Sequence, residues 1–252
     1  MPDTVPMKKK NIYIGCSSYN TADWKGVFYP ENLPKTKWFE YYCEHFSTYE
    51  LNSTFYRFPT LKSLQSWHNK TPENFLFSIK APKQITHIHR FKECRQLIED
   101  FYEVSSEGLA GKLGCVLFQL PPGFDYSASG LELIAGSLNP EFKNVVEFRN
   151  QNWWRPEVFE VLKQRNITFC SVNYPKLPSD IMVTSDIGYV RFHGNPKLFY
   201  SAYDREILEK AQSEILSANE FKEVFVYFNN TASTAGVLNA LEMKELLKSN
   251  RV

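Results

Sequence analysis

The chain has 252 residues, of which 43% are hydrophobic and 23% are charged, and its formal net charge is +1. This composition is ordinary for a soluble globular protein, and it excludes a bulk charge that would attract nucleic acid or a membrane surface. No apolar run is long enough to span a bilayer, and no apolar segment follows Lys8–Lys10 as a signal peptide would require.

The five cysteines form no CxxC pair and are odd in number, which favours reduced thiols. We therefore expect a cytoplasmic protein with no membrane partner. Residues 1–10 are expected to be a flexible N-terminal tail, and residues 11–252 a single domain, because no low-complexity linker divides the chain.

Strand-like runs alternate with helix-like runs along the chain. The expected strands are Ile12–Gly15, Thr48–Asn52, Phe75–Lys80, Gly114–Leu120, Asn144–Arg149, Ile167–Asn173, Gly188–His193 and Val224–Asn229. The expected helices include Lys37–Phe46, Leu61–Asn69, Phe91–Ser105, Glu157–Arg165, Asp204–Ala218 and Ala232–Lys248. Eight strands that alternate with helices over about 250 residues are typical of a TIM-type (β/α)8 barrel in the α/β class. A doubly wound open sheet is the alternative.

Charged side chains lie on one face of the strand expected over Asn144–Arg149. Successive strand residues point to opposite faces, so Glu147 and Arg149 share one face while Phe148 lies on the other. A buried charge is very costly unless it is paired or hydrated. We therefore expect this face to line a polar cavity.

The same alternation recurs in the other strands, and polar residues gather near their C-terminal ends. Active sites of TIM-type barrels lie at that end. The residues expected to converge there are Glu50, Asn52, Lys80, Gln119, Glu147, Arg149, Arg191, His193, Tyr227 and Asn229.

Several short motifs occur together over nearly the whole chain. They are Gly15-x-Ser17, Trp24-Lys25-Gly26-x-Phe28-Tyr29-Pro30, Glu50-Leu51-Asn52-Ser53-Thr54-Phe55-Tyr56, Phe77-Ser78-x-Lys80, Ile85-Thr86-His87, Leu117-Phe118-Gln119-Leu120-Pro121-Pro122, Glu147-Phe148-Arg149, Tyr189-Val190-Arg191-Phe192-His193-Gly194 and Tyr227-Phe228-Asn229-Asn230. In these motifs the chain resembles the domain of unknown function 72 family, the YecE-like group. The resemblance implies a TIM-type barrel and supplies no established reaction.

Four residues are candidates for catalysis: Glu147, Lys80, Glu50 and His193. Glu147 would be the acid–base group, because burial can raise the pKa of a carboxylate. Lys80 would stabilise charge or act as a base, and its structural alternative is a salt bridge to Glu50 or Glu147. His193 titrates near neutrality when unperturbed, and its alternative is a hydrogen-bonded core histidine.

Further residues are candidates for substrate binding. They are Asn52, Tyr56, His87, Gln119, Arg149, Arg191, Tyr227, Asn229, Asn230 and Trp24. The aromatic members have lid or core packing as their structural alternative. No GxGxxG motif or P-loop is present, and we predict no cofactor and no bound metal. A metal site of Glu50, Glu147, His87 and His193 is the alternative that we weighed against this prediction.

Together these patterns favour a metal-independent enzyme that performs acid–base chemistry on a small anionic or sugar-like substrate. Lys80, Arg149 and Arg191 outnumber Glu50 and Glu147 by one charge, which favours an anionic ligand. One alternative is a nucleic-acid-binding or phosphodiester-cleaving protein, which the near-neutral charge does not favour. The other alternative is a metabolite-binding protein without turnover. Sequence leaves the oligomeric state open.

Overall fold

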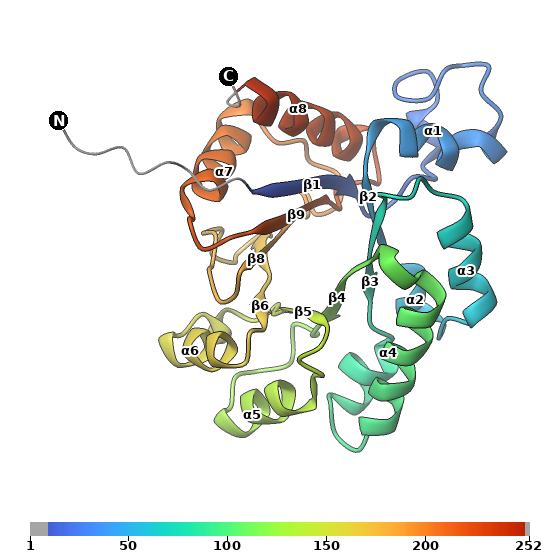
Figure 1. Cartoon of the computed structure of the whole chain (residues 1–252). Helices are drawn as coiled ribbons and strands as arrows, with labels where there is room; N and C mark the ends of the chain where they lie inside the picture. Colours follow the sequence, from blue (N-terminus) through green and yellow to red (C-terminus); the bar gives the residue numbers. More distant parts are fainter. Residues whose placement is uncertain (1–9, 250–252) are drawn as a thin grey trace.

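The structure is a computed structural model, and it describes residues 10–249. Strands occupy the centre of the molecule and helices surround them (Figure 1). The strands are β1 (Asn11–Cys16), β2 (Thr48–Leu51), β3 (Leu76–Lys80), β4 (Leu113–Gln119), β5 (Lys143–Glu147), β6 (Thr168–Phe169), β7 (Ser171–Asn173), β8 (Ile187–Phe192) and β9 (Glu223–Phe228). The α-helices are α1 (Trp38–His45), α2 (Ser53–Tyr56), α3 (Leu61–Asn69), α4 (Arg95–Leu109), α5 (Ala128–Ser137), α6 (Pro156–Gln164), α7 (Arg205–Ser217) and α8 (Ala235–Ser249).

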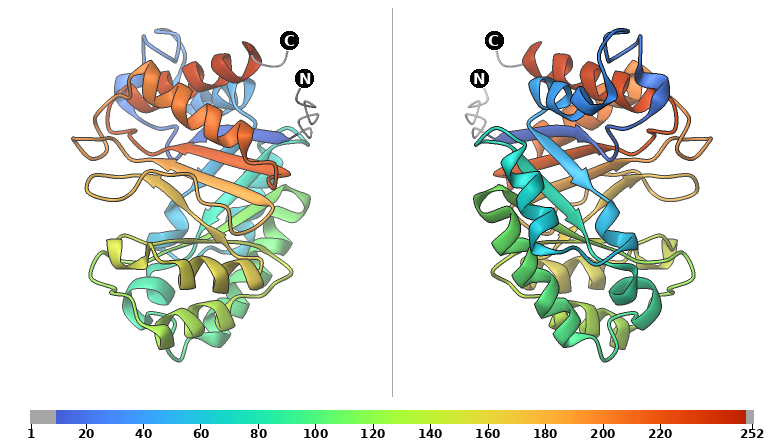
Figure 2. Two further views of the ribbon diagram at one scale, coloured as in Figure 1. Left: turned by 90° about the vertical axis from the view of Figure 1, so that its left-hand side faces the viewer. Right: turned by 90° about the vertical axis from the view of Figure 1, so that its right-hand side faces the viewer.

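The strands form two parallel sheets with the orders β1-β9-β8-β7 and β2-β3-β4-β5-β6. This confirms the α/β class and the parallel strands, but the closed barrel expected from the sequence is not seen among the described residues. In the side views of Figure 2, α7 and α8 lie on one side of the strands, and α4, α5 and α6 lie on the other.

The first interruption lies where one strand was expected over Ile167–Asn173. Cys170 divides this run into β6 and β7. The backbone N–H of Cys170 donates to Val146 of β5, whereas Ser171 pairs with Val190 of β8. The chain thus changes its neighbour at Cys170 and passes from one sheet to the other.

The second interruption lies between β1 and β2, where a side chain replaces the backbone ladder. The hydroxyl of Tyr42 in α1 accepts from the backbone N–H of Cys16 at 2.7 Å and donates to the Thr48 carbonyl at 3.0 Å. The strands are nevertheless close, since a Cβ on Gly15 would lie 2.3 Å from the Thr48 oxygen. The residue at position 15 must therefore be glycine.

Helix boundaries differ from expectation where the backbone is left-handed. The helix expected from Phe91 begins at Arg95, because Arg90, Phe91 and Glu93 have positive φ angles that a right-handed helix does not contain. Pro156 begins α6 as expected.

Lys10 does not behave as part of a tail: it is buried, and its Nζ donates to the carbonyls of Ile215 and Leu216 at the end of α7. Residues 1–9 of the expected tail lie outside the described residues. All five cysteines are free thiols. Within residues 10–249, no helix has both the length and the apolar character needed to cross a bilayer.

Toward the N-terminal ends of the strands, apolar and aromatic side chains fill the space between the sheets. A buried cluster there consists of Cys115, Leu117, Val145, Cys170, Val172, Ile187, Tyr189, Phe225 and Tyr227. Glu147 follows Val145 on the same strand face, and Arg191 follows Tyr189. The charged residues therefore form the next layer above this cluster, toward the C-terminal ends of the strands.

Candidate functional site

Arg191 joins two buried carboxylates across the space between the sheets. Its Nη1 donates to Glu147 Oε2 at 2.5 Å, and its Nη2 donates to Glu50 Oε2 at 2.7 Å. None of the three side chains is more than 1% exposed. Glu50 and Glu147 belong to the five-stranded sheet and Arg191 to the four-stranded sheet, so these ion pairs also connect the two sheets.

Glu50 is held by neutral donors as well as by Arg191. Ser17 Oγ donates to its Oε2 at 2.5 Å, Asn52 Nδ2 donates to the same oxygen at 3.0 Å, and the Tyr189 hydroxyl donates to Oε1 at 2.8 Å. Both oxygens are therefore occupied, and the carboxylate is fixed in position.

Glu147 is surrounded by cations. Its Oε1 accepts from Arg149 Nε and lies 3.2 Å from His193 Nε2, while Oε2 pairs with Arg191. Burial alone would raise the pKa of Glu147, but the charges of Arg149 and Arg191 outweigh burial and hold this pKa well below its usual value. Glu147 is thus ionised at neutral pH, which does not suit the acid–base role expected for it.

His193 is fully buried and neutral. Burial and the nearby charges of Arg149 and Arg191 hold its pKa well below the usual value, despite the opposing effect of Glu147. Its Nδ1 lies 2.8 Å from Asn229 Nδ2, and its Nε2 lies 3.2 Å from Glu147 Oε1 and 3.3 Å from Arg149 Nη2. Both ring nitrogens are engaged, so this histidine is positioned to hold Glu147.

Lys80 is the site's remaining cation, at the C-terminal end of β3. Its Nζ donates to Gln119 Oε1 at 2.7 Å and lies 4.0 Å from the centroid of the Phe55 ring. Burial and the charge of Arg191 lower the pKa of Lys80 to about 7, although Glu147 and Glu50 oppose this shift. The salt bridge expected as its structural alternative is not formed, because Arg191 occupies both carboxylates.

Side chains that are less completely buried than Glu50, Glu147 and Arg191 lie above this network. The guanidinium of Arg149 stacks on the Tyr174 ring at 4.3 Å. His87 packs edge-on against Phe55 at 4.9 Å, and burial together with the charge of Lys80 lowers its pKa to about 4. We call this set of side chains the rim: Asn52, Phe55, Lys80, His87, Arg149, Tyr174 and Asn229.

Two amide oxygens near the network lack a protein partner. Asn52 Oδ1 and Asn173 Oδ1 are buried and accept no hydrogen bond from any described residue. Buried polar atoms are rarely left in this state. They are therefore free acceptors for a ligand hydroxyl or a water molecule.

Four of the predicted binding residues belong neither to the rim nor to the hydrogen-bonded network below it. Trp24 is buried and donates from Nε1 to the Ser233 carbonyl, and Asn230 is buried with its Nδ2 on the Ser201 carbonyl. Tyr227 belongs to the apolar layer below, where its hydroxyl contacts Thr48 and Ser78. Tyr56 is 72% exposed, and its ring packs on Phe55.

Sequence reasoning missed four residues that contact the charged groups: Ser17, Phe55, Tyr174 and Tyr189. The signal for Tyr189 was present, since it shares a strand face with Arg191. Phe55 and Tyr174 lie outside the strands, where no alternation identifies the direction of a side chain.

Metal ligation has no geometric support among residues 10–249, in which no group of three or more His, Cys, Asp or Glu side chains could hold an ion. In the set weighed from sequence, Arg191 lies between Glu50 and Glu147 and pairs with both of them.

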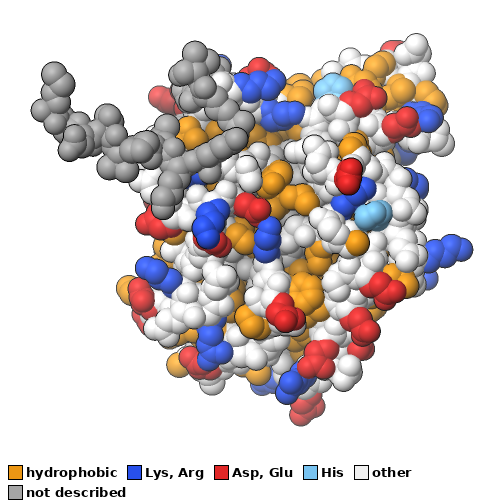
Figure 3. All heavy atoms as spheres, viewed as in Figure 1, with side chains coloured by type: hydrophobic (Ala, Val, Ile, Leu, Met, Phe, Trp, Pro, Cys, Tyr) orange, Lys and Arg blue, Asp and Glu red, His pale blue; other side chains and the backbone are white. Residues whose placement is uncertain are grey.

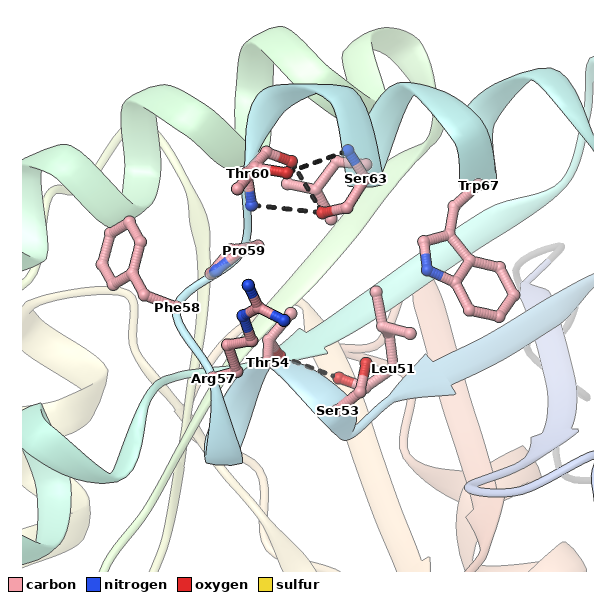
Figure 4. A pocket seen from close by; sticks show the side chains of 10 residues that line it. Leu51, Ser53, Thr54, Arg57, Phe58, Pro59, Thr60, Ser63 and Trp67 are labelled. Carbon is pink, nitrogen blue, oxygen red and sulfur yellow. Dashed lines mark hydrogen bonds between the residues drawn. The ribbon is translucent and has the colours of Figure 1, made fainter.

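A pocket of about 270 Å³ lies elsewhere, between the end of β2 and the first turns of α3 (Figure 4). Arg57 and Trp67 line it, and Thr60 and Ser63 cap the helix beside it. Thr54 connects this pocket to the rim, because its Oγ1 donates to the Lys80 carbonyl at 2.6 Å. The pocket itself holds no member of the charged network.

Known proteins resemble this chain in sequence and in fold. The family described as "Protein of unknown function DUF72" matches residues 13–252, so the chain belongs to that family. A relative in Bacillus subtilis, the UPF0759 protein YunF, is 26% identical, and the match covers 94% of each chain. The UPF0759 protein YecE of Escherichia coli O157:H7 is 29% identical over 67% of this chain and 59% of its own length.

Solved structures agree with this assignment. A DUF72 family protein from Thermotoga maritima has a TM-score of 0.86 and 31% identity, covering 94% of this chain and 99% of its own. A second DUF72 family protein, from Enterococcus faecalis, has a TM-score of 0.77 at 21% identity, covering 94% of this chain and 95% of its own, and shows the fold alone. The family is uncharacterised, so the function must be argued from the site.

Proposed function

We propose that the protein is a metal-independent enzyme that performs acid–base chemistry on a small anionic or sugar-like molecule at the rim, with Lys80 as the proton-transferring group. The observation that carries this proposal is the amino group of Lys80, which is half-buried and unpaired with any described carboxylate. Its pKa of about 7 matches the requirement that a general acid–base group titrate near the working pH.

The remaining groups have supporting roles. Glu50, Glu147 and Arg191 form a fixed scaffold, and Arg149 adds a cation at the rim. Asn52 Oδ1 and Asn173 Oδ1 are free to accept hydrogen bonds from substrate hydroxyls, which supports a sugar-like substrate. Glu147 thus moves from the acid–base role to that of an orienting group.

Two alternatives differ in what they predict. On the face in Figure 3, acidic and basic side chains are interspersed without a continuous basic groove, so this face does not favour nucleic acid. The pKa values of Glu147 and His193 both lie well below their usual values, so neither group transfers protons near neutral pH. This supports the alternative of a metabolite-binding protein without turnover. Product analysis separates binding from turnover.

The test combines a metabolite panel with three variants. Compounds that raise the melting temperature of the wild type are assayed for turnover, and the active one is then used with Lys80→Met, Glu147→Gln and Lys83→Met. We expect Lys80→Met to lower kcat by about 10²–10⁴-fold. If Lys80 acts as a base, wild-type kcat/KM should rise as the pH rises through about 7.

Lys83 is exposed and lies three residues after Lys80, so Lys83→Met is the matched control and should retain full activity. Turnover that survives Lys80→Met with an unchanged pH profile would overturn the proposal. Binding of a compound without any product would favour the non-catalytic alternative.

A further inference from the structure

The amino group of Lys80 differs from the other cations of the network because no carboxylate neutralises it. Arg191 takes one oxygen from each of Glu50 and Glu147, and Arg149 takes the remaining Glu147 oxygen. In the described part of the chain, no Asp or Glu lies within ion-pair distance of Lys80. No ion pair therefore stabilises the protonated form of this amine.

The contacts of Lys80 leave its nitrogen able to react. Gln119 Nε2 donates to the Leu120 carbonyl at 2.6 Å, which fixes the amide so that its Oε1 faces Lys80. A neutral amine has two N–H groups and one lone pair. It can give one N–H to Gln119 and still direct its lone pair elsewhere, while the Phe55 ring limits water on one side.

We propose that Lys80 is a nucleophile that forms an imine with the carbonyl carbon of an anionic aldehyde or ketone. The inference rests on the proposed function, since it concerns the same site, and it names the substrate class. The rim supplies a guanidinium for the anionic group, because Glu147 uses only Nε of Arg149, and Arg149 is close enough to Lys80 to act on it electrostatically.

The chemical step is balanced without any further reactant. The lone pair of Nζ forms the C–N bond while the carbonyl π pair moves to oxygen. One N–H proton passes to that oxygen, which gives a carbinolamine. The nitrogen lone pair then forms the C=N bond as the hydroxyl leaves as water with a proton taken from the solvent, which gives the iminium. Loss of the remaining N–H proton to the solvent gives the neutral imine, so no proton is gained or lost overall.

The protonation state supports this reactivity. An ordinary lysine with a pKa near 10.4 has about one free amine in 2,500 at pH 7. Lys80, with a pKa of about 7, is about half unprotonated at the same pH. This difference is about a thousandfold, and a less basic amine loses part of it through lower intrinsic nucleophilicity. We therefore expect Lys80 to react at least about tenfold faster than an exposed lysine.

The experiment traps the imine with a small anionic aldehyde. The full chain is incubated at pH 7 with glyoxylate and sodium cyanoborohydride, which reduces an imine to a stable secondary amine. Peptide mapping by mass spectrometry then measures the rate at which each lysine gains one carboxymethyl group. We expect Lys80 to be labelled at least about tenfold faster than Lys83, with a rate that rises as the pH rises through about 7.

Two variants complete the test. Lys80→Arg keeps the charge but removes the nucleophile, so its early labelling should disappear, whereas Lys83→Met should leave Lys80 labelling unchanged. Labelling of Lys80 no faster than Lys83 would overturn the imine. If Lys80→Met abolishes turnover while glyoxylate does not label Lys80, the acid–base proposal stands and the imine falls. If Lys80 is labelled rapidly but no compound is turned over, the nucleophile is retained and the enzymatic proposal falls.

Discussion

Lys80 is buried next to cations in a way that costs stability. Its pKa in the folded chain is about 7, below the 10.5 of an unperturbed lysine, because of burial and the charge of Arg191. Below pH 7 both the folded and the unfolded chain hold the proton, so the full cost is present there. Between about pH 7 and pH 10.5 the unfolded chain holds more protons, so stability rises with pH across this range.

Lys80→Met should therefore stabilise the protein at low pH. The whole pKa shift corresponds to about 5 kcal/mol, and losing the contacts with Gln119 and Phe55 reduces the gain to about 2 kcal/mol at pH 6. The gain should shrink as the pH approaches 10. Urea unfolding at pH 6 and pH 9 measures it, with Lys83→Met expected within about 0.5 kcal/mol of the wild type. A less stable Lys80→Met at pH 6 would contradict the burial cost.

The residues of the network were predictable from strand alternation, but their pairing was not. Glu50, Glu147, Arg191 and His193 come together because the C-terminal ends of parallel strands meet. Alternation gives the face of a side chain and not its reach, so it left both carboxylates as partners for Lys80. The lowered pKa of Glu147 depends on that pairing, so it could not be predicted from the sequence either.

At the scale of elements, the Tyr42 hydroxyl replaces the ladder between β1 and β2. The strands themselves were predicted from their residues, but this contact was not, because it comes from a helix side chain. A closed barrel requires a continuous ladder around all its strands. Tyr42 and the change of neighbour at Cys170 together account for the two sheets.

Tyr42→Phe should destabilise the protein by about 2 kcal/mol, because the buried N–H of Cys16 loses the hydroxyl that accepts it. The matched control is Tyr41→Phe, which removes the same hydroxyl from a half-buried position that does not join the sheets. The control should change the free energy of unfolding by less than about 0.5 kcal/mol. Amide hydrogen exchange should also accelerate at Cys16 in Tyr42→Phe alone. Equal effects of the two substitutions would refute the bridging role.

At the scale of the whole molecule, the two sheets share one core. The main buried cluster contains Ile14 and Val226 from the four-stranded sheet and Phe77 and Val146 from the five-stranded sheet. Arg191 adds ion pairs between the same sheets. The α/β class followed from the alternation of strands and helices, whereas the break in the barrel depends on single side chains.

This shared core predicts one cooperative unfolding transition, as expected for a single domain. Far-UV circular dichroism and tryptophan fluorescence should give the same urea midpoint within error. Tyr42→Phe should lower this midpoint without splitting the transition. Two separate midpoints would mean that each sheet unfolds on its own and that the chain contains two folding units.

The bridge made by Arg191 also limits how this interior can change by mutation. Removing one member of a buried ion pair costs about 3–5 kcal/mol, whereas exchanging the whole set for apolar residues is often neutral. Evolution by single substitutions would therefore pass through a destabilised protein, whichever of Glu50, Glu147 and Arg191 changed first. Protein engineers who wish to empty this interior of charge would have to replace all three together.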